Sequence, residues 1–310
     1  GSEMCIRDSA QPMFRSIGED TGVALAHNGN LVNTTALKRR AVQLGIMPEN
    51  ELAGCASDTD VVASLLAHTA VNGGLEEAAL HLLPKVEGAF CFVMCDTDTI
   101  YAARDPYGVR PLSLGRLDRG WVVASETCAL DIVGASYVRD IEPGEFVTIN
   151  ATGVHSRRFA EPRHARCVFE HVYLARPDSF LNGRSVNAAR VEIGRSLARE
   201  HPCDGDLVIP VPESGTPAAV GYAQESGIPF AQGLTKNSYV GRTFIQPSQT
   251  IRQLGIRLKL NPLREVIRGK RLVVVDDSIV RGNTQRALVS MLREAGAALS
   301  LIHISEPTRL

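Results

Sequence analysis

The chain has 310 residues, 44% of them apolar, and a net charge of −1, a length that suggests about two domains. The near-neutral charge gives no electrostatic reason to expect binding to nucleic acid or to a membrane surface. No apolar run approaches the roughly 20 residues of a transmembrane helix. The seven scattered cysteines contain no Cys-x-x-Cys pair, which predicts a reducing, cytoplasmic location.

Both ends of the sequence differ from the rest. Residues 1–9 show neither a strand nor a helix period, and residues 299–310 follow a helical pattern abruptly. We expect these ends to be non-native, with ordinary ragged termini as the alternative. Two predicted domains remain, 10–162 and 163–298, and they meet at a joint rich in proline and charge.

In the N-terminal half, helical patterns come first and short strands follow them. Helices are predicted at 36–44, 59–71 and 75–83. Strands are predicted at 23–26, 89–95, 99–103, 112–114, 121–125 and 145–149. Several short strands after helices indicate an antiparallel α+β layer structure.

In the C-terminal half, strands and helices alternate. Strands are predicted at 206–211, 228–233 and 272–275, and helices at 185–200, 217–225 and 285–297. This alternation predicts an α/β domain with a parallel sheet and right-handed crossovers.

The strand at 272–275 ends in two carboxylates, Asp276 and Asp277. A small polar loop and a helix start follow, and loop N–H groups together with the positive end of a helix dipole form an anion site. No Gly-Lys-Ser/Thr sequence closes the loop, so it is not a Walker loop. The carboxylates would accept hydrogen bonds from sugar hydroxyls, or they would reach a Mg²⁺ ion that is bound to a pyrophosphate. Two solvated aspartates after an apolar strand are the alternative.

The run from 272 to 284 resembles the ribose-phosphate loop of the type I phosphoribosyltransferases, which bind phosphoribosyl pyrophosphate (PRPP). The resemblance implies that PRPP contacts Asp276, Asp277, Ser278, Ile279, Val280, Arg281, Gly282, Asn283 and Thr284. It also implies a Mg²⁺ site formed by Ser214, Asp276 and Asp277.

A long, cation-rich connection precedes this loop, at 236–249 and 257–262. Connections of this length are usually functional. The family resemblance implies a lid that closes over the pyrophosphate and excludes water, with Lys236 and Arg242 as the cations that neutralise its charge. A solvated basic loop is the alternative.

Four short motifs mark the N-terminal half. They are Ala-His-Asn-Gly-Asn at 26–30, Ser-Asp-Thr-Asp at 57–60, Arg-Asp-Pro-Tyr-Gly-Val-Arg-Pro at 104–111 and Val-Ala-Ser-Glu at 123–126. In this order they resemble the N-terminal-nucleophile glutaminase domain of the glutamine amidotransferases. That chemistry hydrolyses an amide through a thioester and requires a nucleophile, a base and an oxyanion hole.

The resemblance assigns roles to three residues of these motifs. The oxyanion hole would consist of the side-chain amide of Asn28 and the backbone N–H of Gly29, and Asp58 would hold the ammonium group of glutamine. A hairpin turn is the alternative for Asn28 and Gly29, because Asn-Gly after a strand is a turn signal. A plain helix N-cap is the alternative for Asp58.

The family's nucleophile is a cysteine at the first position, and its own α-amine is the base. Cys5 is followed by Ile-Arg-Asp, where the family has Gly-Ile-Val/Ile, and too few residues separate it from the first motif. We therefore interpret the nucleophilic cysteine as absent and the chain as truncated at both ends. We expect no glutamine-dependent activity from it, although weak ammonia-dependent activity could remain.

The segment 167–179 resembles the stretch that couples the two domains in the amidophosphoribosyltransferase family. Membership implies formation of 5-phosphoribosylamine from PRPP and glutamine-derived ammonia, the first step of purine biosynthesis. It also implies Mg²⁺, a homo-oligomer and feedback inhibition by purine nucleotides. Some members hold a [4Fe–4S] cluster through a cysteine at the position of Cys167, but clusterless members carry a cysteine there too. A cluster ligand in the full-length protein and a plain buried thiol both stay open.

Two other functions fit parts of the pattern. The chain could be a non-catalytic module that senses PRPP, but it lacks a basic DNA-binding element and carries the lid residues of a catalyst. It could be a salvage phosphoribosyltransferase that uses a free base, but such an enzyme needs no ammonia source, and the glutaminase motifs weigh against it.

Overall fold

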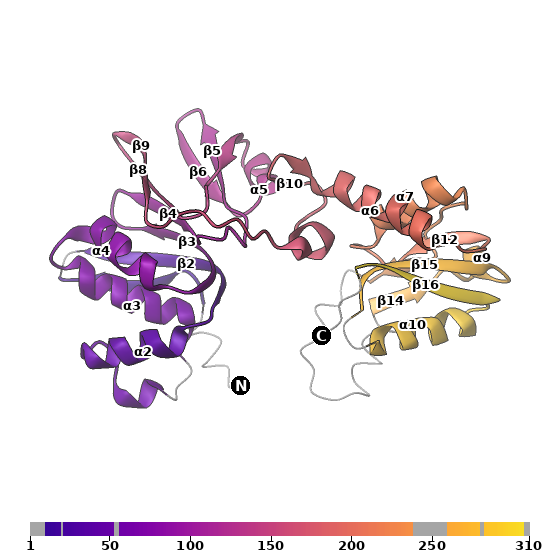
Figure 1. Cartoon of the computed structure of the whole chain (residues 1–310), viewed down its shortest axis with the longest axis horizontal. Coiled ribbons are helices and arrows are strands. Elements are labelled where there is room, and N and C mark those ends of the chain that lie inside the picture. Colours follow the sequence, from indigo (N-terminus) through magenta and orange to yellow (C-terminus); the bar gives the residue numbers. More distant parts are fainter. Residues whose placement is uncertain (1–9, 20, 53–55, 238–258, 280–281, 307–310) are drawn as a thin grey trace. The chain divides into compact units, whose positions relative to one another are not determined.

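The computed structural model describes residues 10–306 except residue 20 and the segments 53–55, 238–258 and 280–281, with the backbone alone for 299–306 (Figure 1). The chain divides into two compact units, Gly1–Cys167 and Val168–Leu310. The predicted boundary after residue 162 lies close to this division. None of the helices in the described part is long and apolar enough to cross a membrane.

The first unit is built around a six-stranded antiparallel sheet in the order β1-β2-β3-β4-β8-β9. Its strands are β1 Met13–Ile17, β2 Thr21–Leu31, β3 Gly88–Cys95, β4 Ile100–Arg104, β8 Glu145–Asn150 and β9 Gly153–Arg158. A smaller antiparallel sheet has the order β6-β5-β7, with β5 Ser113–Leu117, β6 Gly120–Ala124 and β7 Ser136–Asp140. The predicted antiparallel α+β class is confirmed.

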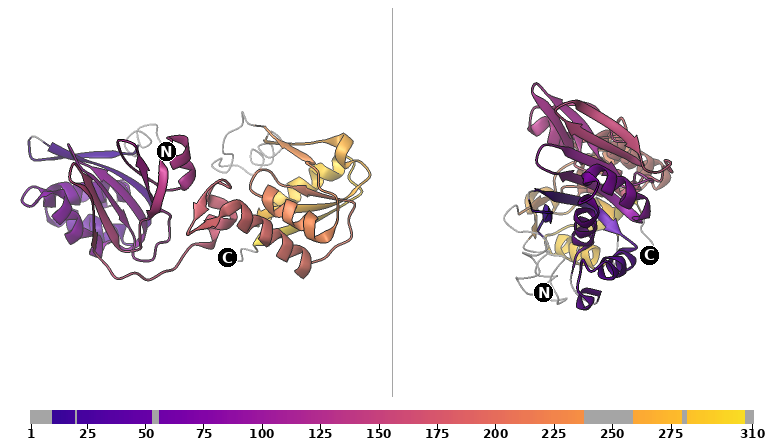
Figure 2. Two further views of the ribbon diagram at one scale, coloured as in Figure 1. Left: turned by 90° about the horizontal axis from the view of Figure 1, so that it is seen from above. Right: turned by 90° about the vertical axis from the view of Figure 1, so that its left-hand side faces the viewer.

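Both faces of the large sheet are covered (Figures 1 and 2). The helices α2 Thr34–Gln43, α3 Asp58–Ala70 and α4 Gly74–Leu82 share a hydrophobic core with Phe90 and Phe92 of β3. Cys91, between these two phenylalanines, belongs to a second core with Leu114 of the small sheet. Successive strand residues point to opposite faces, so the continuous apolar sequence of β3 follows from burial on both sides.

The predicted helices and strands of this unit are confirmed, with ends that shift by a few residues. The sequence analysis missed β1, β7, β9 and the helix α5 Thr127–Ile132. Strands β7 and β9 are largely exposed and have no apolar run, so their strand conformation depends on pairing with β5 and β8. Two 3₁₀ turns complete the unit, η1 Glu49–Leu52 and η2 Leu83–Lys85.

The second unit contains a parallel sheet in the order β12-β15-β16, as the sequence predicted. Its main elements are α6 Val186–Glu200, β12 Leu207–Pro210, α7 Thr216–Ser226, β15 Arg271–Ser278, α10 Asn283–Glu294 and β16 Leu299–Glu306. Shorter elements are η3 Glu170–Leu174, β10 Phe180–Leu181, β11 Arg184–Ser185, β13 Leu234–Lys236, β14 Leu260–Pro262 and α9 Arg264–Ile267. Val273 and Val275 of β15 pack in one core with α7, and Leu272 and Val274 pack in another with α10.

Two expectations for this unit need correction. The strand predicted at 228–233 is reduced to a single bridge between Phe230 and Val208. The segment excluded from the predicted fold, 299–310, contributes β16, which pairs in parallel with β15. Whether the two ends of the chain are native stays a prediction.

Helices α6 and α7 approach closely through glycine. A Cβ atom at Gly194 would collide with the carbonyl oxygen of Ala218, and one at Gly221 would collide with that of Val191. Each helix therefore offers a glycine where the backbone of the other passes. These two glycines allow the backbones of α6 and α7 to pack in direct contact.

We expect Gly221→Ala to lower the free energy of unfolding of the second unit by about 1–3 kcal/mol, because the added methyl group overpacks the helix contact. Thermal unfolding measures the change. Gly73→Ala is the control, since a Cβ there meets nothing closer than 3.9 Å. Equal melting temperatures for Gly221→Ala and the native chain would show that α6 and α7 can separate without loss.

Candidate functional sites

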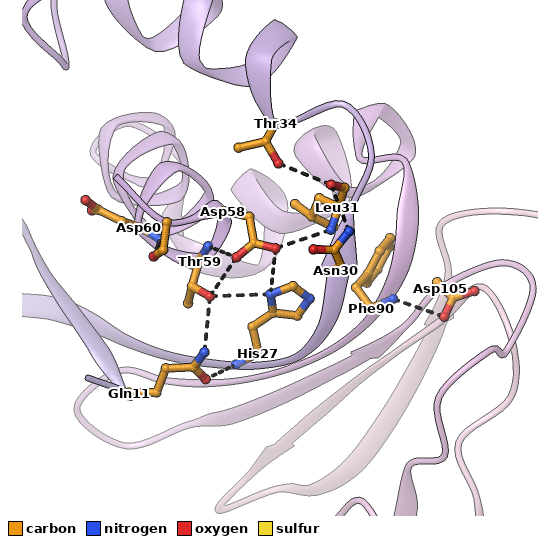
Figure 3. A network of polar contacts seen from close by, with 11 residues as sticks. Gln11, His27, Asn30, Leu31, Thr34, Asp58, Thr59, Asp60, Phe90 and Asp105 are labelled. Carbon is orange, nitrogen blue, oxygen red and sulfur yellow. Dashed lines mark hydrogen bonds and ion pairs between the residues drawn. The ribbon is translucent and has the colours of Figure 1, made fainter. Parts of the chain in front are cut away.

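Asp58 lies at the start of α3 and joins this helix to strand β2 (Figure 3). Its carboxylate accepts hydrogen bonds from the backbone N–H groups of Leu31, at 3.2 Å, and Thr59, at 2.8 Å. Its Oδ2 atom lies 3.5 Å from Nδ1 of His27, whose side chain is 2% exposed. Ser57 is the N-cap of the helix, so the interpretation of Asp58 as a plain N-cap is wrong.

The surroundings of Asp58 favour the charged carboxylate. Burial by itself raises the pKa of Asp58. The hydrogen bond and charge of His27 and the N–H groups of Leu31 and Thr59 together outweigh this effect and lower the pKa to about 2. The group is therefore ionised at neutral pH. An ionised, partly exposed carboxylate can hold an ammonium group, as the sequence analysis predicts.

Asn28 and Gly29 lie within β2, where they pair with Cys91 and Phe90 of β3. The alternative prediction of a hairpin turn at Asn-Gly is therefore wrong. Gly29 has a φ angle of 152°, and a Cβ there would collide with the carbonyl oxygen of Ala89. The strand passes so close to β3 that this position requires glycine.

The side-chain amide of Asn28 connects the remaining motifs. Its Oδ1 accepts a hydrogen bond from Nε of Arg110 at 3.1 Å, and its Nδ2 donates to Oγ of Ser125 at 3.1 Å. Together with the contact of His27 and Asp58, these bonds bring all four motifs to one place. The sequence analysis quoted the motifs that contain His27, Arg110 and Ser125 but gave these residues no role, because nothing in a linear sequence shows which side chains meet.

Replacement of Asp58 by Asn should lower the free energy of unfolding of the first unit by about 1 kcal/mol at pH 7. The folded pKa, about 2, lies below the ordinary value of 3.8. The stabilisation is therefore fully present above pH 3.8 and is lost as the pH falls through about 2. Denaturant unfolding of both proteins between pH 7 and pH 2 should show a difference that shrinks below pH 4.

The matched control is Asp118→Asn, which neutralises an exposed carboxylate between β5 and β6. Its difference from the native chain should stay near zero across the same pH range. A loss in Asp58→Asn that persists unchanged to pH 2 would contradict the ionic origin of the stabilisation.

In the second unit, Asp276, Asp277 and Ser214 meet at one edge of the parallel sheet. Strands β12 and β15 are parallel neighbours, so their carboxyl ends lie side by side. Oγ of Ser214 donates a hydrogen bond to Oδ2 of Asp277. A Cβ at Gly215 would lie 2.7 Å from the carbonyl oxygen of Val275, so the glycine allows the Ser214 loop to approach β15.

The two carboxylates are buried, each residue being 7% exposed, and the alternative of two solvated aspartates is wrong. Asp276 accepts hydrogen bonds from the backbone N–H of Asp277, at 2.9 Å, and from Nε2 of Gln285, at 3.2 Å. Burial and then the negative charge of Asp277 raise the pKa of Asp276 to about 6. A pair of buried carboxylates is a common environment for a cation or for sugar hydroxyls.

The strand β15 is followed by a loop and then by the start of helix α10, as the sequence predicts. Ser278 donates through Oγ to Oδ1 of Asp277 at 2.6 Å, and Ile279 follows in irregular structure. Gly282, with a φ angle of 69°, is the N-cap of α10. The helix begins with Asn283 and Thr284. The predicted PRPP contacts Val280 and Arg281 lie outside the described residues.

The predicted lid begins and ends in a two-stranded antiparallel ribbon, β13 and β14. Lys236, the last residue of β13, places Nζ 3.2 Å from Oε2 of Glu213, in the same loop as Ser214. This cation therefore lies beside the loop of the predicted magnesium site. Arg242 and most of the predicted lid lie outside the described residues.

The described residues contain no group of three His, Cys, Asp or Glu side chains that could hold a metal ion. Mg²⁺, however, is often held by one or two carboxylates together with waters and substrate phosphates. Asp276, Asp277 and Ser214 fit an ion that arrives with a pyrophosphate. Cys167 is a half-buried free thiol, so its two interpretations both stay open.

The comparisons with known proteins agree with both sites. A family model described as a glutamine amidotransferase domain matches residues 3–131, and one described as a phosphoribosyl transferase domain matches residues 187–305. The amidophosphoribosyltransferase of Mycobacterium tuberculosis (strain H37Rv) is 70% identical over 97% of this chain. That of Bacillus subtilis (strain 168) is 45% identical, also over 97%.

The chain belongs to the amidophosphoribosyltransferase family. It spans 57% of the length of the M. tuberculosis relative and 62% of that of B. subtilis. A solved structure described as glutamine phosphoribosylpyrophosphate amidotransferase from B. subtilis complexed with ADP and GMP matches 97% of this chain, and 65% of that chain is covered, with a TM-score of 0.87 and 45% identity. The resemblances to a glutamine amidotransferase and to a phosphoribosyltransferase are thereby confirmed.

Proposed function

We propose that this chain carries the glutaminase and phosphoribosyltransferase sites of an enzyme that makes 5-phosphoribosylamine, the first step of purine biosynthesis. The observation that carries the proposal is the meeting of Ser214, Asp276 and Asp277 at the edge of a parallel sheet. In the same chain, Asn28 contacts Arg110 and Ser125 of two further family motifs, and Asp58 contacts His27, the neighbour of Asn28. An ammonia source and a ribose-phosphate site together match one reaction.

In the glutaminase half, each residue would act on a different part of glutamine. The ionised carboxylate of Asp58 would hold the ammonium group. Nδ2 of Asn28 and the N–H of Gly29 would donate to the carbonyl oxygen as it becomes negative.

In the transferase half, ammonia would attack C1 of the ribose of PRPP. A C–N bond forms as the C–O bond to pyrophosphate breaks, and the proton that the attacking nitrogen loses passes to the departing pyrophosphate. Asp276 and Asp277 would accept hydrogen bonds from the ribose hydroxyls. The loop from Ser278 to Thr284 and the start of α10 would hold the phosphate. Lys236 and Arg242 would balance the charge of the departing pyrophosphate, and a Mg²⁺ ion at Ser214 and the aspartates would supply further positive charge.

Further expectations accompany this proposal. Glutamine, PRPP and Mg²⁺ would be the substrates and cofactor, and purine nucleotides the feedback inhibitors. The last point is supported by the ADP and GMP in the structure from B. subtilis. A homo-oligomer and a cytoplasmic location stay predictions. The PRPP-sensing and salvage alternatives gain no support, because neither uses the glutaminase residues.

Isothermal titration of PRPP, with and without Mg²⁺, tests the transferase site. We expect Mg²⁺-dependent binding by the native chain and a loss of at least about 100-fold in Asp276→Asn/Asp277→Asn, since two charge-assisted contacts disappear. The control Glu200→Gln/Glu265→Gln removes two exposed carboxylates from the same unit and should bind as the native chain does. Equal affinity of the aspartate double variant and the native chain would refute the ribose-phosphate site.

A further inference from the structure

The side-chain amide of Asn28 can serve as an oxyanion donor in only one of its two orientations. Nδ2 donates hydrogen bonds, whereas Oδ1 only accepts them and would repel a negative oxygen. The two orientations have nearly the same shape, so neighbouring polar groups must select one of them. The residue that makes this selection decides whether the site can stabilise an oxyanion.

Arg110 is a neighbour that can select the orientation. Its Nε lies 3.1 Å from Oδ1 of Asn28. A guanidinium has only donors and stays charged, so the atom that faces it must be the oxygen. Ser125, on the other side of the amide at 3.1 Å, offers a hydroxyl that can donate or accept, and it therefore fits either orientation.

A buried arginine fixes the backbone at Arg110. Arg104 is 5% exposed, and its Nε donates to the carbonyl oxygen of Arg110 at 2.8 Å. Its Nη1 and Nη2 donate to the carbonyl oxygens of Ile141, at 2.8 Å, and Gly108, at 3.1 Å. One planar group thus holds three points of the surrounding chain, including the residue that contacts Asn28.

Asp105 ties the same loop to the sheet (Figure 3). It is fully buried and accepts hydrogen bonds from the N–H groups of Phe90, at 3.2 Å, and Tyr107, at 2.9 Å. Phe90 is the partner of Gly29 in the pairing of β2 with β3. The loop is therefore held in register with the strand that carries both predicted oxyanion donors.

We propose that Arg110 is a positioning residue that holds the Asn28 amide with Nδ2 available to the oxyanion, and that Arg104 and Asp105 hold Arg110 in place. This inference rests on the proposed glutaminase function. Donation to Oδ1 also polarises the amide and strengthens Nδ2 as a donor, because linked hydrogen bonds reinforce one another. The motif at 104–111 thereby gains a role, since it orients a catalytic group through Arg110.

The ¹⁵N spectrum of the asparagine-labelled full chain reports the orientation of the amide. The Asn28 N–H₂ signals are assigned by their loss in Asn28→Asp. We expect one sharp pair in the native chain and in Ser125→Ala, because the guanidinium still faces Oδ1. We expect a broadened or second pair in Arg110→Gln, because a glutamine amide fits either orientation. Arg110→Lys, which again offers only donors, should restore the single pair.

Arg116→Gln is the matched control, since it loses the same charge from a side chain that stacks over Trp121 at 4.5 Å. It should leave the Asn28 signals unchanged. One sharp pair in folded Arg110→Gln would overturn the proposal. If that variant does not fold, Ser125→Ala still decides the question, because a split pair there would show that the hydroxyl selects the orientation.

Titration with glutamine separates this inference from the proposed function. Glutamine should shift the Asn28 pair in the native chain, because Nδ2 then donates to the substrate, and the shift should vanish in Asp58→Asn. Binding that moves other signals but leaves Asn28 unmoved would overturn the oxyanion role while the glutaminase function stands. If glutamine does not bind, the glutaminase function fails, and the variant spectra still show whether Arg110 sets the amide.

Discussion

Burial of a central strand on both faces is the constraint on which each unit depends. In the first unit β3 lies between three helices and a second sheet, and in the second unit β15 lies between α7 and α10. A strand covered on both sides has to be apolar along its length, because buried polar groups without partners are costly. Polar side chains can then appear only where the strand ends. Asp276 and Asp277 occupy such an end.

The buried charged groups of the two units have different surroundings. Arg104 and Asp105, at the end of β4, have several backbone hydrogen-bond partners, although burial still raises the pKa of Asp105. Asp276 instead lies beside a second carboxylate, and the pKa of Asp276 rises to about 6. Stability alone would not favour this pair. We expect such a pair of carboxylates where a ligand supplies the missing positive charge or hydrogen-bond donors.

Much of the fold could be predicted because its signals are local. The apolar runs of β3 and β15 and the helical periods of α3, α6 and α10 are each contained in one segment. The strands β7 and β9 could not be predicted, because their residues are polar and exposed and take the strand conformation from their neighbours. Asn28-Gly29 has the sequence of a turn, but the long pairing of β2 with β3 overrides that local preference.

By itself, the sequence determined the class of each domain and most of its longer helices and strands, and it predicted a ligand-binding loop after Asp276 and Asp277, because these depend on residues that are adjacent in the chain. Only the tertiary structure decided which distant side chains meet. It placed Ser214 on Asp277, His27 on Asp58, and Arg110 on the amide of Asn28. Such contacts depend on strand pairing and on the packing of loops against the sheet, and neither is written in the local pattern of residues.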